Sequence, residues 1–377
     1  MMKSCYRWIK RNAVILCLLL FIGIFCVFRL QKSDIKVLQC HKKNDNTVAY
    51  SITYHAATTL HQQQEIENLV NDIEAALDYY SLDAEVSLFN HHYDSEPFTY
   101  RTAYFYPILA KIKAIHSTTQ GAFDPTVAPY ITLWKAHQKV HSEPSQEAIW
   151  AISPAVSLDY MVVNQTRVKK LKEDVTININ NLISSFQADT LADYVQEKEI
   201  RDFCIELEDA VVTRGIPSKK GHWRIVKQIA HPELEKPLKI HIDLGDSAMA
   251  VIDNSKSLED DELQAICIDP LTGDSIPQHF LIACVFAEDC VTAKGYATAL
   301  MTQNFEHAFA LTAKADKLDF VVIERDETIN GGIKYRHSAG VQVIYKEGAT
   351  KVQVKHIGNS ATISADDKPA SGIHVKE

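Results

Sequence analysis

The sequence lacks the short motifs that identify several common enzyme classes. It contains no P-loop, no G-x-G-x-x-G, no H-E-x-x-H and no G-x-S-x-G, so the phosphate, dinucleotide, zinc-peptidase and serine-hydrolase sites built on those motifs are not predicted. It also lacks an excess of positive charge. The net charge of −9 disfavours nucleic acid as a partner, because such a partner requires a basic face.

Cysteine is present but is not arranged as a scaffold. Of the eight cysteines, Cys5, Cys17 and Cys26 fall within the first 30 residues. The remaining number is odd and no C-x-x-C occurs, so neither a disulfide framework nor a zinc site is expected. Buried free thiols are the favoured interpretation.

The N-terminus predicts a membrane anchor. An uninterrupted apolar run extends from Ala13 to Phe28, close to the roughly 20 residues that cross a bilayer as a helix. Four cations precede it, at Lys3, Arg7, Lys10 and Arg11, and they place the N-terminus in the cytoplasm. We therefore expect residues 1–30 to be a single-pass anchor, with the domain outside the cytoplasm and a bacterial inner membrane as the location. A cleaved signal peptide is the main alternative, and lipid attachment at Cys26 a third.

The rest of the chain predicts one α+β domain. Residues 31–46 are polar and indicate a linker, residues 47–356 the domain, and residues 357–377 a flexible tail. Alternation predicts a strand over 48–54, and helical spacing predicts helices over 66–80, 105–115 and 188–199. Strands are expected at 280–287 and 320–324, with helices at 293–302 and 305–315 between them. This order has no regular βαβ repeat, which indicates the α+β class.

One loop combines rigidity with polar groups. In the segment GAFDPTVAPYITLW, from Gly121 to Trp134, the glycine permits a positive φ, and Pro125 and Pro129 favour an extended path. Asp124 and Thr126 would present an acceptor and a donor on this rigid loop. The alternative is a structural role, in which both side chains cap the following helix.

This loop is also where the sequence resembles the ApbE family, the FAD:protein FMN transferases. Four other segments are similar to family motifs in the same order: YYSLDAEVSLFN at 79–90, GHWRIV at 221–226, IDPLTG at 268–273 and YATAL at 296–300. The resemblance implies a single flavin-transferase domain. It implies FAD as the substrate, Mg²⁺ as the metal, and transfer of FMN to a threonine of an acceptor redox protein.

The resemblance also implies a set of site residues. The flavin-contacting positions correspond to Tyr80, Ala122, Phe123, Asp124, Asn178, Ser184 and Ile268. The metal positions correspond to Asn181, Ala297 and Thr298, with Lys294 standing where the family has a metal-binding aspartate. Phe123 and Asp124 are expected to line the main pocket. No catalytic residue is assigned.

Several positions depart from the family pattern, and they are the ones that would touch metal and pyrophosphate. Ser184 stands in place of a lysine, and a Gly-Gly pair becomes Glu208-Asp209. The histidine before the I-D-P turn becomes Ile266. An ammonium has no lone pair for Mg²⁺, so Lys294 would either bind phosphate directly or be a solvated surface lysine.

Three functions therefore remain open: an FMN transferase with an unusual site, a non-catalytic flavin-binding or interaction protein, and a weak FAD pyrophosphatase. The segment Glu347–Thr350 resembles the threonine motif of acceptor proteins, although a hairpin turn between strands at 341–345 and 352–356 is the favoured interpretation.

Overall fold

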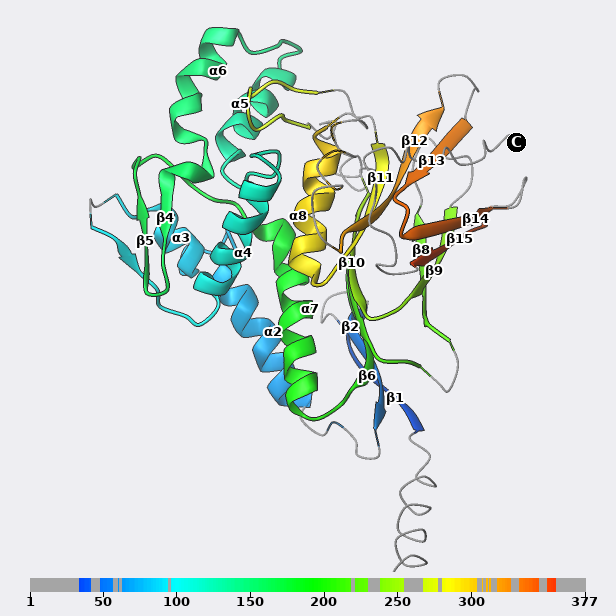
Figure 1. The fold of residues 1–377 in the computed structure, drawn as a ribbon. Helices are drawn as coiled ribbons and strands as arrows, with labels where there is room; N and C mark the ends of the chain where they lie inside the picture. Colours follow the sequence, from blue (N-terminus) through cyan, green and yellow to red (C-terminus); the bar gives the residue numbers. More distant parts are fainter. Residues whose placement is uncertain are drawn as a thin grey trace, which may run out of the picture.

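The computed structural model combines helices with mainly antiparallel strands. It describes residues 34–41, 48–56, 60, 63–93, 96–217, 221–229, 238–253, 267–276, 280–303, 307, 310, 312, 317–326, 332–345 and 351–356. Within these residues the predicted α+β class is confirmed, and helices cover one face of a long sheet (Figure 1).

The central sheet has eight strands in the order β1-β2-β6-β7-β10-β11-β12-β13, and all neighbours are antiparallel. The strands are β1 (Asp34–His41), β2 (Val48–Ala56), β6 (Asp202–Leu207), β7 (Ala210–Arg214), β10 (Ser247–Asp253), β11 (Phe280–Ala287), β12 (Asp319–Asp326) and β13 (Gly332–His337). Every residue of β11 is buried. Its run of apolar residues is therefore typical of a strand with both faces covered.

A second sheet covers one of those faces. It has the order β14-β15-β9-β8, and β15 pairs with β9 in parallel. Its strands are β8 (Trp223–Ile229), β9 (Leu238–Leu244), β14 (Val341–Tyr345) and β15 (Lys351–His356). Cys284 and Phe286 of β11 belong to the core shared with this sheet, whereas Ala283 and Val285 belong to the helical core.

Helices form the other layer. They are α2 (Gln63–Leu77), α3 (Glu85–Asn90), α4 (Phe105–Thr118), α5 (Ala128–Gln138), α6 (Gln146–Ile152), α7 (Asn180–Glu197) and α8 (Cys290–Met301), with short 3-10 turns at Ser153–Ala155 and Leu158–Tyr160. A small sheet β3-β5-β4 flanks them, with β3 (Phe98–Thr99), β4 (Met161–Val163) and β5 (Arg167–Lys170).

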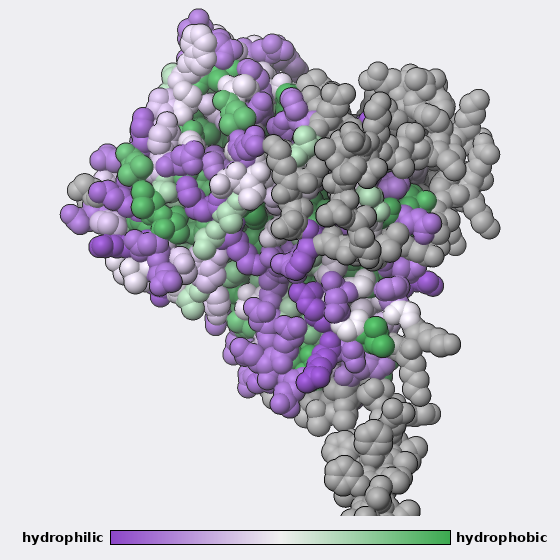
Figure 2. All heavy atoms as spheres, viewed as in Figure 1, coloured by the Kyte–Doolittle hydropathy of each residue, from purple (hydrophilic) through white to green (hydrophobic). Residues whose placement is uncertain are grey.

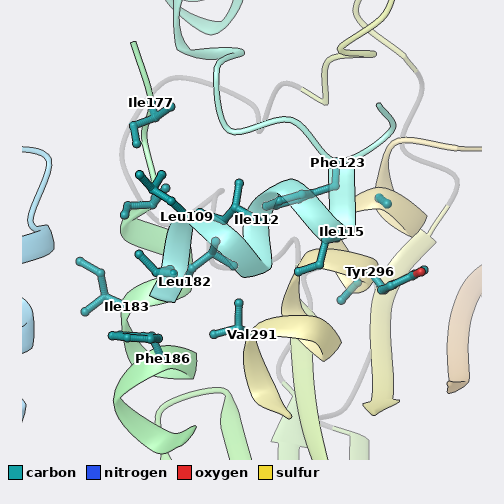
Figure 3. Packing of buried hydrophobic residues seen from close by; sticks show 14 of the residues in the cluster. Leu109, Ile112, Ile115, Phe123, Ile177, Leu182, Ile183, Phe186, Val291 and Tyr296 are labelled. Carbon is teal, nitrogen blue, oxygen red and sulfur yellow. The ribbon is translucent and has the colours of Figure 1, made fainter. Parts of the chain in front are cut away.

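The helical core lies where α4, α7 and α8 meet. Figure 3 shows Ile112 and Ile115 of α4 close to Val291 and Tyr296 of α8. A Cβ added at Gly295 would lie 2.9 Å from the Ile115 side chain, so this glycine permits close approach of α8 to α4. The outer side of α2 is hydrophilic, as its amphipathic pattern predicts, and the lower part of the molecule in Figure 2 is correspondingly purple.

Most predicted elements are confirmed, with shifted ends. The strand at 48–54 is β2, the two helices that follow are α2 and α4, and the expected 341–356 strands pair as β14 and β15. The third helix, α7, begins at Asn180 rather than near residue 188. The five described cysteines are free, as predicted, but the prediction that they are buried holds only for Cys204, Cys284 and Cys290.

One boundary is wrong. The stretch 31–46, predicted as a linker, contains β1, because Asp34–His41 pairs with β2 along its whole length. The expected anchor at 1–30, most of the helix at 305–315, the segment 347–350 and the tail at 357–377 lie outside the described residues. Among the residues that are described, no helix is both long and apolar enough to cross a membrane.

Candidate functional site

The loop after α4 is organised around Asp124, which is buried at 8% exposure. One carboxylate oxygen accepts hydrogen bonds from the backbone N–H of Thr126 at 2.8 Å and from its hydroxyl at 2.6 Å. The other accepts the N–H of Leu158 at 3.0 Å. Gly121 has the predicted positive φ, 86°. Asp124 therefore stabilises its own loop and fastens it to the 158 turn, rather than capping the next helix.

A cavity of about 500 Å³ opens beside this loop, and Asp124, His116, Ser157 and Leu271 are among the residues that line it. The His116 Nε2 atom lies 3.2 Å from a carboxylate oxygen of Asp124. Phe123, in contrast, is part of the hydrophobic core. The expectation that both residues line one pocket therefore holds for Asp124 only, and a role of either in flavin binding stays a prediction.

The prediction of an extended path at both prolines is also corrected. Pro129 lies in the first turn of α5, where a fixed φ and a missing N–H cost nothing. Pro125 remains outside the helix, and its carbonyl oxygen accepts the N–H of Asn178 at 2.9 Å. This bond brings the loop next to the start of α7, where further predicted site residues lie.

The substituted positions form a connected group. Lys294 on α8 is buried, at 6% exposure. Its ammonium donates to the carboxylate of Asp209 and lies 3.5 Å from the Val251 carbonyl oxygen. Asp209, in the turn between β6 and β7, also accepts a 3.2 Å hydrogen bond from the Ser184 hydroxyl. Lys294 is thus not a solvated surface lysine, and direct binding of phosphate by Lys294 stays a prediction.

The predicted metal positions do not fit Mg²⁺. The ammonium of Lys294 has no lone pair to offer a metal, and its positive charge repels a cation. The hydroxyl of Thr298 donates to the Lys294 carbonyl oxygen at 2.9 Å, and Asn181 is exposed on the first turn of α7. Within the described part of the chain, no group of three or more His, Cys, Asp or Glu side chains could hold a metal ion.

A second cavity, of about 280 Å³, lies beside Ser184. Asn180 connects its walls: it accepts the Tyr79 N–H at 2.7 Å and donates to Asp78 at 3.1 Å. Tyr80, the residue after Tyr79, is 77% exposed.

The other predicted flavin positions lie in the core or in turns. The Ala122 carbonyl oxygen accepts the Thr302 hydroxyl at 3.2 Å. Ile268, at the start of the IDPLTG turn, is buried and forms an isolated β-bridge with Ser275, which follows that turn. Ala297, a predicted metal position, is fully buried within α8.

One charged cluster lies at the start of α8, and the sequence analysis assigned it no role. Asp189 of α7 accepts the N–H groups of Cys290 and Val291 at 2.7 and 3.1 Å. Lys111 bridges it to Asp289, at 3.6 and 3.0 Å. Burial, together with the nearby Asp289, raises the pKa of Asp189 to about 7. The cluster satisfies the helix terminus and joins α4 and α7 to α8.

The comparisons with known proteins agree with this architecture. The model of the ApbE family matches residues 47–322, and the chain belongs to that family. A protein of Vibrio cholerae called FAD:protein FMN transferase is 26% identical over 270 residues, covering 70% of this chain and 80% of the relative. A Haemophilus influenzae protein of the same name is 24% identical over 291 residues, covering 75% and 83%.

Solved structures share the fold. The flavin transferase ApbE of Vibrio cholerae superposes with a TM-score of 0.66 at 23% identity, covering 81% of this chain and 98% of that one. The apo flavinyl transferase ApbE of Pseudomonas stutzeri gives 0.67 at 17% identity, covering 82% and 96%.

Proposed function

We propose that this chain is a flavin-binding member of the ApbE family that does not perform Mg²⁺-dependent FMN transfer. The observation that carries the proposal is the buried contact between Lys294 and Asp209. An ammonium bonded to a carboxylate then stands at the position that the resemblance assigns to the family's metal-binding aspartate.

Flavin binding is supported by the retained loop and by the relatives. The Asp124 loop keeps its family sequence and is held by hydrogen bonds to Thr126 and Leu158. Relatives that cover most of this chain are named FAD:protein FMN transferases.

Loss of transfer is supported by the requirements of the reaction. Splitting FAD at its pyrophosphate and passing FMN to a hydroxyl is a substitution at phosphorus, which needs the charge on the phosphates to be neutralised. When bound, Mg²⁺ supplies that neutralisation and orients the oxygens. Here the positive charge of Lys294 is offset by Asp209, and Ser184 offers no second cation.

We also propose that residues 1–30 anchor the protein in a bacterial inner membrane with its domain on the extracytoplasmic side. Four cations precede the apolar run from Ala13 to Phe28. A redox protein there is the proposed partner. Recovery of the protein from membranes at full length would support the anchor, whereas a soluble product shortened at the N-terminus would indicate a cleaved signal peptide.

The activity test uses purified full-length protein with FAD, Mg²⁺ and a threonine-containing acceptor peptide, and a Vibrio cholerae relative as the positive control. We expect flavin binding by fluorescence, with neither AMP release nor covalent flavin on the peptide. Release of AMP together with labelled peptide would identify a working transferase. Release of AMP alone would identify an FAD pyrophosphatase. If the protein bound no flavin, the proposal would be refuted.

A further inference from the structure

We infer that the flavin site beside Ser184 prefers a flavin that carries no phosphate, such as riboflavin, over FMN and FAD. This inference rests on the proposed flavin binding and adds the class of ligand. It follows from the charges around Ser184, which determine whether a phosphate anion is tolerated there.

The first observation is that Lys294 adds no net positive charge. Its ammonium is bonded to the carboxylate of Asp209, and its side chain is only 8% exposed. Two of its three N–H groups are used by Asp209 and by the Val251 carbonyl oxygen, so a phosphate group that reached the third would lie next to the Asp209 carboxylate. The Lys294–Asp209 pair is therefore an unfavourable place for phosphate, since like charges at short range repel strongly in a protein.

The second observation is the charge of the cavity beside Ser184. Glu74, Asp78 and Glu208 line it, and the lining residues that the structure describes include no lysine or arginine. Its other polar groups include the side chains of Asn180 and Gln187, which suit hydroxyl and amide groups. The cavity thus offers hydrogen bonds but an unfavourable potential for anions.

The three flavins differ in their negative charge. FMN ends in a phosphate monoester with a charge of about −1.5 to −2 at pH 7, and the pyrophosphate of FAD is also anionic. Riboflavin has the same ring and ribityl chain without these charges. We expect riboflavin to bind at least about tenfold more tightly than FMN or FAD at low salt, and the difference to narrow as salt screens the carboxylates.

The experiment titrates riboflavin, FMN and FAD into the full-length protein by flavin fluorescence, at about 20 mM and about 300 mM salt, between which the screening length falls severalfold. Two variants probe the carboxylates: Glu208→Gln, with Glu74→Gln as a second test from a different element. Each should reduce the ratio of riboflavin to FMN affinity by about threefold at low salt.

Glu199→Gln is the matched control. Both residues have a positive φ, which is 61° at Glu199 and 46° at Glu208. It follows the C-terminal end of α7, about 20 Å along the helix axis from Ser184 at 1.5 Å per residue. This control should leave the affinity ratio unchanged.

The outcomes separate this inference from the proposed function. Tighter binding of FMN or FAD than of riboflavin would overturn the preference and leave flavin binding intact. The preference would also be overturned if the ratio of riboflavin to FMN affinity changed neither with salt nor in the two carboxylate variants. If none of the three flavins binds, both the proposed function and this inference are wrong.

Discussion

Replacing Lys294 by methionine tests the Lys294–Asp209 pair most directly. Methionine keeps most of the apolar stem but removes the charge, so among the described residues Asp209 is left with a hydrogen bond from the Ser184 side chain. Breaking a buried ion pair by removing one partner costs about 3–5 kcal/mol. The Asp209 side chain is 22% exposed, so water compensates in part. We expect Lys294→Met to lower the free energy of unfolding by about 2–3 kcal/mol.

A double-mutant cycle isolates the pair. Asp209→Asn alone should destabilise the protein at least as much as Lys294→Met, because it leaves a lysine whose side chain is only 8% exposed. The double variant should be more stable than the sum of the two losses predicts, by about 1 kcal/mol or more. Urea unfolding followed by tryptophan fluorescence measures all four proteins.

The control is an exposed pair of the same kind. Lys317 and Glu288 form an ion pair with side chains 61% and 66% exposed. Lys317→Met should therefore change the stability by less than about 1 kcal/mol. Equal stability of Lys294→Met and the parent, or strict additivity in the cycle, would refute the assignment of this pair as a buried, stabilising contact.

Three further predictions concern pH, metal and packing. Because burial raises the pKa of Asp189 to about 7, its protonation favours the folded state at low pH and this stabilisation is lost as pH rises through 7. Between pH 5 and 8, the free energy of unfolding of the parent in urea should fall by roughly 2 kcal/mol more than that of Asp189→Asn. A difference between the two proteins that does not change with pH would contradict this. Millimolar Mg²⁺ or EDTA should leave the melting temperature and the flavin affinity of the parent unchanged. The double variant Lys294→Asp with Asp209→Gly, in contrast, should gain stability when Mg²⁺ is added. A parent whose stability or affinity depends on metal would count against the proposed function. Gly273→Ala should destabilise the protein by about 1–3 kcal/mol, since φ is 77° and the new Cβ would lie 2.6 Å from Ile149 and 2.8 Å from Tyr130; an unaffected midpoint would contradict this geometry.

Local sequence patterns predicted much of the fold. Alternation located β2, and helical spacing located α2 and α4, because each pattern is set by the side chains of a single element that faces one core. Where such a pattern was weak, the prediction failed. β1 exposes Ile35 and Val37, at 59% and 57%. Its apolar residues change from one face of the strand to the other between Val37 and Leu38, so no continuous alternation predicted its pairing with β2.

The sequence by itself also indicated the ApbE family, which the match over residues 47–322 confirms, and it predicted that the metal and phosphate positions are altered. It could not determine what the altered residues do. From the sequence, Lys294 was expected to bind phosphate or to face solvent. Only the tertiary structure brings Lys294 to Asp209, 85 residues away in the chain.

That contact depends on the packing of α8 against the β6–β7 turn, which no local pattern encodes. The physical reason is general. A side chain's charge is a property of the residue, but whether the charge is available to a ligand depends on which distant group neutralises it and on how much water reaches both.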